Sequence, residues 1–335
     1  MQGLLKELVE TPGVSGGEAE VREFIEDELQ NYADEVETDS FNNLVARKGD
    51  GDTTLMVVAH MDQIGLSVKD LSVSDIRDDG YLEFAEIGGI NEDTLYNQHV
   101  TVHTDDDEYH GIIGLKPPHM EEESSKLYVD IGADSREEVE DLGIEKGDYI
   151  TWDRGLEELQ NDYVTGPALD NRVGCTVAID AFKEFDEDYE LITVFSTQEE
   201  VGLKGAKTAA YDIDPDAALA VDVSVGDEGS SIDPGEGVDI TLMQGEGRGL
   251  MTPESVKDWL VETAENEGHD YQLSMTEGGY TDAAKIELAK DGIPTGSLGV
   301  PLEYMHSATE KVSLGDMEAT SEYLQDVYET FEDHF

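Results

Sequence analysis

The run Thr54-Leu-Met-Val-Val-Ala-His60-Met-Asp62 places a short, wholly apolar segment directly before a histidine and an aspartate. A continuous apolar strand is typical of a sheet that is covered on both faces. Because side chains alternate along an extended chain, His60 and Asp62 lie on the same side where the strand ends. The segment therefore predicts a buried strand of an α/β sheet that carries polar groups at its end.

Apolar spacing on both sides of this strand predicts further helices and strands. Before it, the pattern indicates a helix over 18–32 and a strand over 43–48. After residue 162, helices are predicted over 172–185, 204–211, 253–267, 282–290 and 314–331, and strands over 191–196, 217–223, 238–243, 271–275 and 294–300. Strands that alternate with helices indicate an α/β sheet.

Residues 64–161 have a different pattern. The segments 64–68, 81–86, 99–102, 111–115, 127–131 and 148–152 resemble short strands, and only 135–142 resembles a helix. Closely spaced short strands are typical of a small β-rich domain. We therefore predict one α/β domain, formed by residues 1–63 and 162–335, that is interrupted by a β-rich domain of residues 64–161.

The composition is strongly acidic, with 80 Asp and Glu against 20 Lys and Arg, and a net charge of −60. Nucleic acids and anionic membranes are excluded as partners because both require a basic surface. The carboxylates are spread along the chain, which argues against a disordered acidic tail. The better interpretation is a halophilic surface. In about 1 M salt the Debye length is about 3 Å, so the repulsion between like charges on such a surface is screened.

The compartment is expected to be the cytoplasm. A single cysteine, Cys175, cannot form an intramolecular disulfide, which fits a reducing environment. The N-terminal residues lack the apolar region of a signal peptide, and no uncharged apolar run is as long as a spanning helix.

Histidines and acids recur at the ends of the predicted strands, where open α/β sheets bind their ligands. Besides His60 and Asp62, these residues are Asp170, Glu199, Glu200, Asp222 and His306. Each has an ordinary alternative explanation, such as a hydrogen-bonded histidine, an aspartate that caps a helix or two acids on an acidic surface. Asp222 is the hardest to explain in this way, because an unpaired carboxylate inside an apolar strand is costly.

Two histidines and three acids from separate strand ends match a pair of cations that share one bridging carboxylate. Mixed imidazole and carboxylate ligands favour zinc, cobalt or manganese over calcium or magnesium. Two such metal ions per subunit would generate a hydroxide at neutral pH and polarise a carbonyl group. A further acid that is not a ligand is needed to accept the proton.

Eight motifs in this order resemble the tetrahedral (TET) aminopeptidases, dinuclear metallopeptidases that include the glutamyl and deblocking aminopeptidases. The resemblance covers essentially the whole chain. The motifs are AHMDQIGL (59–66), IGGI (87–90), GIIGLKPPH (111–119), ALDNRVGC (168–175), TQEEVGLKGA (197–206), AVDVS (220–224), GGYTDA (278–283) and YMHS (304–307). The resemblance to this family implies a mixed sheet flanked by helices, with a barrel-like or PDZ-like β-rich insert that mediates dimerisation.

The resemblance also implies a role for each candidate residue. One metal ion is held by His60, Asp170 and Asp222, and the other by Asp170, Glu200 and His306, with Asp170 as the bridge. Glu199 matches the general base. Asp62 matches the carboxylate that orients His60. Asp282 matches a residue near the site and is given no role.

We therefore expect a metal-dependent aminopeptidase that hydrolyses N-terminal residues from peptides through a metal-bridged hydroxide. In the family, dimers assemble into a hollow dodecamer with the active sites inside. Tyr280 and Glu303 depart from residues that are usual in the family, on the side of the substrate. The alternatives are a deacylase or carboxypeptidase on a related two-metal fold, and a non-catalytic acidic protein that stores cations; Glu199 beside Glu200 argues against the latter.

Overall fold

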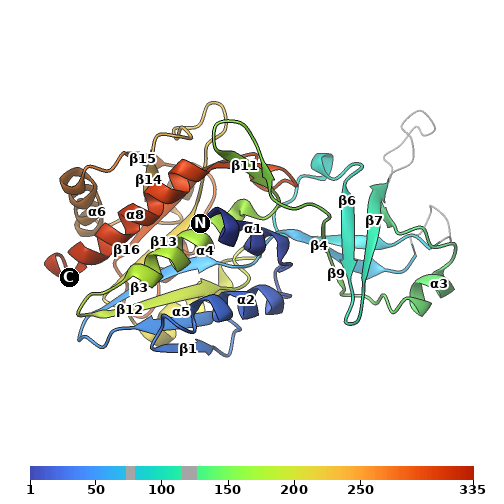
Figure 1. The fold of residues 1–335 in the computed structure, drawn as a ribbon, viewed down its shortest axis with the longest axis horizontal. Helices are drawn as coiled ribbons and strands as arrows, with labels where there is room; N and C mark the ends of the chain where they lie inside the picture. Colours follow the sequence, from blue (N-terminus) through green and yellow to red (C-terminus); the bar gives the residue numbers. More distant parts are fainter. Residues whose placement is uncertain (73–79, 115–126) are drawn as a thin grey trace.

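The computed structural model describes residues 1–72, 80–114 and 127–335, and it contains two separate β-sheets. Figure 1 shows a larger unit of mixed sheet and helices, with a smaller β-rich unit projecting from one side. Within the described residues, no helix is both long and apolar enough to cross a membrane. The second half of the 111–119 motif lies outside the described residues.

The larger sheet has 11 strands and is mixed. Its central strands β12 (Glu190–Ser196), β3 (Thr54–His60), β13 (Ala217–Val225) and β16 (Thr295–Glu303) are parallel to one another. On one side the sheet continues with β2 (Leu44–Lys48) and β1 (Glu35–Thr38), and on the other with β17 (Glu310–Ser313), β11 (Tyr163–Gly166) and β10 (Glu157–Glu158). β14 (Val238–Met243) also pairs with β16, and β15 (Tyr271–Met275) pairs with β14.

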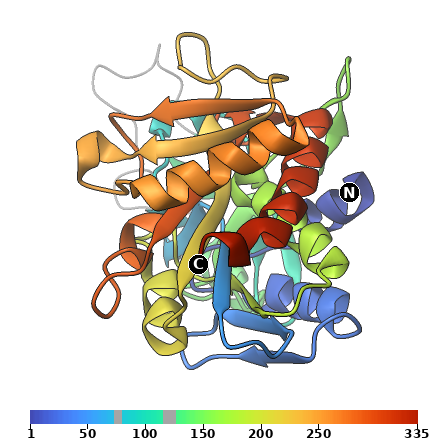
Figure 2. The ribbon, with the colours of Figure 1, turned by 90° about the vertical axis from the view of Figure 1, so that its left-hand side faces the viewer.

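Helices cover both faces of this sheet, which explains why its central strands are continuously apolar. One face packs against α1 (Gln2–Glu10), α2 (Ala19–Leu29), α4 (Leu169–Glu184), α6 (Glu254–Glu267) and α8 (Leu314–Thr330). The other face packs against α5 (Lys204–Ile213) and α7 (Ala283–Ile286). Figure 2 looks onto the end of the molecule formed by α6 and α8, opposite the smaller unit.

The smaller unit is an antiparallel sheet of six strands in the order β5-β4-β9-β6-β7-β8. These strands are β5 (Glu83–Ile87), β4 (Gly65–Asp70), β9 (Tyr149–Trp152), β6 (His99–His103), β7 (Glu108–Gly114) and β8 (Tyr128–Asp130), and α3 (Arg136–Asp141) accompanies them. Leu82 and Val129 exchange two backbone hydrogen bonds of 2.9 Å and so bring the two edges of the sheet together. The prediction of a mixed α/β sheet with a barrel-like β insert is confirmed.

Two details differ from the sequence prediction. The helix predicted over 282–290 is limited to α7, because the chain continues in tighter turns, such as the hydrogen bond from the Ala289 N–H to the Ile286 carbonyl, and Leu288 faces solvent. The short strands β1, β10, β11 and β17 were not predicted. The domain boundaries at 63/64 and 161/162 stay a prediction; β10, which precedes the second boundary, pairs within the larger sheet.

Candidate metal centre

His60 ends β3 and is almost fully buried, with 2% of its surface exposed. Its Nδ1 lies 3.1 Å from the backbone carbonyl of Asp62 and 3.6 Å from the Asp62 carboxylate. The same carboxylate accepts hydrogen bonds from the backbone N–H groups of Glu199 and Glu200, at 3.0 and 3.3 Å. Asp62 therefore contacts both His60 and the loop that carries Glu199 and Glu200. The second imidazole nitrogen of His60, Nε2, faces the carboxylates of Asp170 and Asp222.

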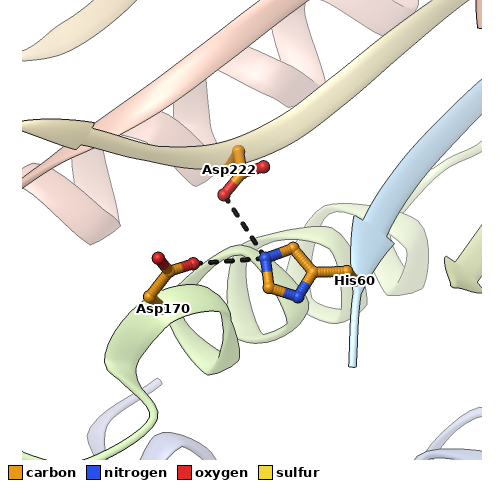
Figure 3. Close-up of side chains that lie close together, drawn as sticks. All are labelled: His60, Asp170 and Asp222. Atoms are coloured by element: carbon orange, nitrogen blue, oxygen red, sulfur yellow. Dashed lines mark hydrogen bonds and ion pairs between the residues drawn. The ribbon is translucent and has the colours of Figure 1, made fainter. Parts of the chain in front are cut away.

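Asp170, near the start of α4, lies between the two candidate histidines. One carboxylate oxygen is 3.1 Å from Nε2 of His60, and the other is 3.4 Å from Nε2 of His306. Figure 3 shows that Asp170 and Asp222 approach the same imidazole nitrogen of His60 from two different elements, with Asp222 at 3.7 Å. This arrangement presents one carboxylate oxygen of Asp170 to each histidine.

The second group consists of Asp170, Glu200 and His306. Nε2 of His306 lies 3.5 Å from Glu200, and its Nδ1–H donates to the Gly89 carbonyl at 2.8 Å, which leaves Nε2 as the free nitrogen. Gly89 belongs to the β-rich insert, so this unit orients a residue of the cluster. In each group one donor atom per residue lies within 4.8 Å of the others.

The electrostatics of the two groups fit divalent cations. Burial raises the pKa of Asp222 to about 7 and that of Glu200 to about 8, and the nearby negative charge of Asp170 adds to both effects. Burial also opposes the charged form of Asp170, yet the hydrogen bonds from His306 and His60 hold its pKa below the usual range. Oε1 of Glu200 is buried without a partner among the described residues. Two cations that share Asp170 would compensate these carboxylates.

Glu199 lies beside the two groups and belongs to neither of them. Its Oε2 is 4.0 Å from Nε2 of His60. Burial raises its pKa well above the usual range, and the neighbouring Asp282 and Asp222 add to the effect. Asp282 accepts a hydrogen bond from the Ser196 hydroxyl, and its other carboxylate oxygen is buried without a partner in the described part of the chain.

One residue of the centre was missed by the sequence analysis. Glu310 is 1% exposed, and its two oxygens accept hydrogen bonds from the backbone N–H groups of His306, at 2.8 Å, and of Asp170, at 3.0 Å. It thus fixes the backbone of one residue from each side of the cluster. Its only sequence signal is an acid four positions after His306, which is weak evidence in so acidic a chain.

The cluster opens into a cavity of about 500 Å³. Its other walls include Ser224, Thr241, Tyr280 and Lys285. Tyr280 therefore lines the cavity beside the cluster, as expected for a residue that faces the substrate, whereas Glu303 forms an ion pair with Lys311 and does not line this cavity. A second hollow of about 650 Å³, between the N-terminal helix and the insert, contains neither group of candidate metal-binding residues.

Comparisons with known proteins identify the family. A profile of the M42 glutamyl aminopeptidases matches residues 42–323. A putative aminopeptidase of Acetivibrio thermocellus is 38% identical over 329 residues, which are 95% of each chain.

Two solved structures have the same fold. An aminopeptidase from Desulfurococcus kamchatkensis has a TM-score of 0.92 and 37% identity, covering 98% of this chain and 94% of the other. The TET1 peptidase of Pyrococcus horikoshii, which can assemble into a tetrahedron or a large octahedral shell, has a TM-score of 0.88 and 31% identity, covering 98% of both chains.

The fold, the family match and the paired groups of candidate metal-binding residues define a metallo-aminopeptidase, which is a peptide hydrolase. This chain belongs to the M42 glutamyl aminopeptidase family. Membership implies a dinuclear metal site, and the expected resemblance to the TET aminopeptidases is confirmed.

Proposed function

We propose that the chain releases N-terminal residues from peptides at the cluster of His60, Asp170, Glu200, Asp222 and His306. The observation that carries the proposal is the placement of Asp170, whose two oxygens face two different imidazoles. Two divalent cations held by these residues, with zinc or cobalt favoured and manganese possible, would lower the pKa of water and polarise the scissile carbonyl. The peptide is held in the adjoining cavity, which Tyr280 partly lines.

Glu199 is the proton carrier in this proposal. It is buried beside the cluster without belonging to either group, so its carboxylate is free to accept a proton from the attacking water. The same oxygen then returns the proton to the leaving nitrogen of the peptide. Asp62 keeps this residue in place through the backbone N–H of Glu199 and supports His60 on the other side.

Acetylation of the substrate tests the reaction itself. We expect a chromogenic leucine anilide to be hydrolysed and its N-acetyl derivative to be left intact, because an aminopeptidase requires the free amino group. Hydrolysis should be followed with zinc, cobalt and manganese in turn, in molar salt. Release of acetate from the N-acetyl derivative would instead indicate a deacylase, and equal release of the aniline from both compounds would indicate an endopeptidase.

The proposed assembly is a homo-oligomer built from dimers, with a tetrahedral dodecamer as its complete form. The tetrahedral shell of the Pyrococcus horikoshii relative supports this proposal. The β-rich insert, residues 64–161, is the proposed dimerisation unit, because it projects from the larger unit (Figure 1) and exposes Ile112 on β7. The proposed compartment is the cytoplasm, where the one cysteine would stay reduced.

Assembly and activity should depend on salt, because we propose that the net charge of −60 is a halophilic adaptation. At about 1 M salt the screening length is near 3 Å, and at about 0.1 M it is near 10 Å, so repulsion between subunits grows as salt is removed. We expect the assembly to dissociate and activity to fall over this range, as measured by sedimentation velocity and anilide hydrolysis. Sucrose of equal osmolality should not restore either property. An assembly that stays intact and active at 0.1 M salt would contradict the halophilic interpretation.

A further inference from the structure

A buried carboxylate lies next to the catalytic cavity and takes no part in the metal centre. Asp239, on β14, is 0% exposed, and its Oδ2 accepts hydrogen bonds from three hydroxyl groups. These come from Ser224 at 2.5 Å, Thr241 at 2.9 Å and Ser274 at 2.8 Å. The other oxygen, Oδ1, has no partner in the described part of the chain. Three neutral donors on one buried oxygen form a fixed arrangement.

The backbone makes this arrangement possible through a glycine. Gly299, on β16, is paired with Asp222 of β13 on one side and with Asp239 of β14 on the other. A Cβ atom at Gly299 would lie 1.9 Å from Oγ of Ser224 and 3.3 Å from Oδ2 of Asp239. The hydrogen bond between Ser224 and Asp239 therefore crosses directly over this glycine.

The carboxylate determines what the hydroxyl groups can do. Each hydroxyl has one proton, and where that proton is donated to Asp239, only the oxygen lone pairs remain for other partners. Ser224 and Thr241 line the catalytic cavity, whereas Ser274 does not. This part of the wall can therefore accept hydrogen bonds and cannot donate them. It lies close to the metal centre, since Ser224 follows Asp222 by two positions and faces the same side of the strand.

We propose that Asp239 is a positioning residue that makes Ser224 and Thr241 acceptors for the α-ammonium group of the peptide substrate. The inference rests on the proposed function. An ammonium group has three hydrogen-bond donors and no acceptor, so it complements a part of the cavity wall that offers only acceptors. The negative charge of a buried carboxylate directly behind the hydroxyl groups adds to the attraction.

The α-ammonium group fits this wall better than a cationic side chain does. A cationic side chain is carried only by those peptides that begin with a basic residue. The α-ammonium group, in contrast, is present in every substrate of an aminopeptidase and is attached to the carbon next to the scissile carbonyl. The wall beside Asp222 is therefore assigned to this group.

The test compares Ser224→Ala with the matched variant Ser274→Ala. Both remove one hydroxyl donor to Asp239, but only the first removes an oxygen from the cavity wall. A hydrogen bond to a charged group is worth about 1.5–3 kcal/mol, which corresponds to about 10-fold to 150-fold in affinity. For the anilides of leucine and lysine, we expect Ser224→Ala to raise KM by at least about tenfold with kcat changed less than about threefold. Ser274→Ala should change KM less than about twofold.

A second measurement follows ligand binding and does not depend on catalytic turnover. Butylamine and butanol should be compared as competitive ligands by calorimetry on the metal-loaded protein. Ser224→Ala should weaken the binding of the amine by about tenfold and leave that of the alcohol unchanged. Gly299→Ala should act like Ser224→Ala, because the added methyl group displaces the serine oxygen.

Three results would overturn the inference. They are an unchanged KM in Ser224→Ala, equal effects of Ser224→Ala and Ser274→Ala, and an effect confined to the lysine anilide, which would assign the wall to the side chain. Failure of the parent enzyme to cleave either anilide would instead count against the proposed function, so the two failures are distinguishable.

Discussion

Replacing Glu199 by Gln should lower kcat by at least about a hundredfold while both metal ions stay bound. General acid–base groups typically contribute about 10²–10⁴ in rate, and the amide cannot carry the proton. The change is nearly isosteric, and Glu199 belongs to neither group of candidate ligands. KM should change little, because the lost interaction belongs to the transition state. The measurements are steady-state kinetics and metal content by plasma mass spectrometry.

The neighbouring residue provides the matched control. Glu200→Gln makes the same chemical change one position away, but it alters a residue that approaches His306 at 3.5 Å. We expect this variant to lose metal as well as activity, whereas Glu199→Gln loses activity alone. A Glu199→Gln enzyme that keeps near-parental turnover with both metal ions bound would remove Glu199 from the mechanism.

Replacing Asp170 by Asn should abolish binding of both metal ions. Asp170 contributes an oxygen to each group, and a neutral amide is a far weaker ligand than a carboxylate. Variants of residues that only support a metal ligand typically cost 10–100-fold in metal affinity, so we expect a loss of at least about a hundredfold here. Metal ions supply several kcal/mol to the transition state, and activity should therefore fall by at least about a thousandfold.

His306→Ala separates the two sites. His306 belongs to one group only, so its loss should leave about one metal ion bound by His60, Asp170 and Asp222. The metal content of the two variants, titrated with cobalt and followed by its visible absorption, should thus differ by one ion per subunit. Equal metal content in Asp170→Asn and His306→Ala would show that Asp170 is not shared.

Much of the fold could be predicted because its central strands are strongly apolar. The ranges 238–243 and 271–275 coincide with β14 and β15, and the residues at the ends of the parallel strands do converge at one edge of the sheet. The missed strands lack such a signal: β1 is mostly exposed, and β17, Glu-Lys-Val-Ser, has a single apolar residue. Their positions depend on pairing with distant strands.

The candidate ligands could also be anticipated, because an acid in an apolar strand is costly without a cation. The role of Glu310 could not be anticipated, because this residue contacts the backbone of Asp170, which is 140 positions away in the sequence. The three hydroxyl groups that donate to Asp239 could not be predicted from the sequence for a related reason. Serine and threonine are common in strands, and only the pairing of β14 with β15 and β16 brings these side chains together.

The position of β17 in the larger sheet has a consequence for biosynthesis. β17 lies between β16 and β11, so β11 and β10 have no place in the sheet until residues 310–313 have left the ribosome. The same residues include Glu310, which holds the backbone of two residues of the metal centre. The insert, in contrast, is synthesised as one continuous stretch and can form its six strands early. A nascent chain thus carries its proposed dimerisation unit well before the sheet and the backbone contacts of Glu310 at the candidate metal centre can be completed.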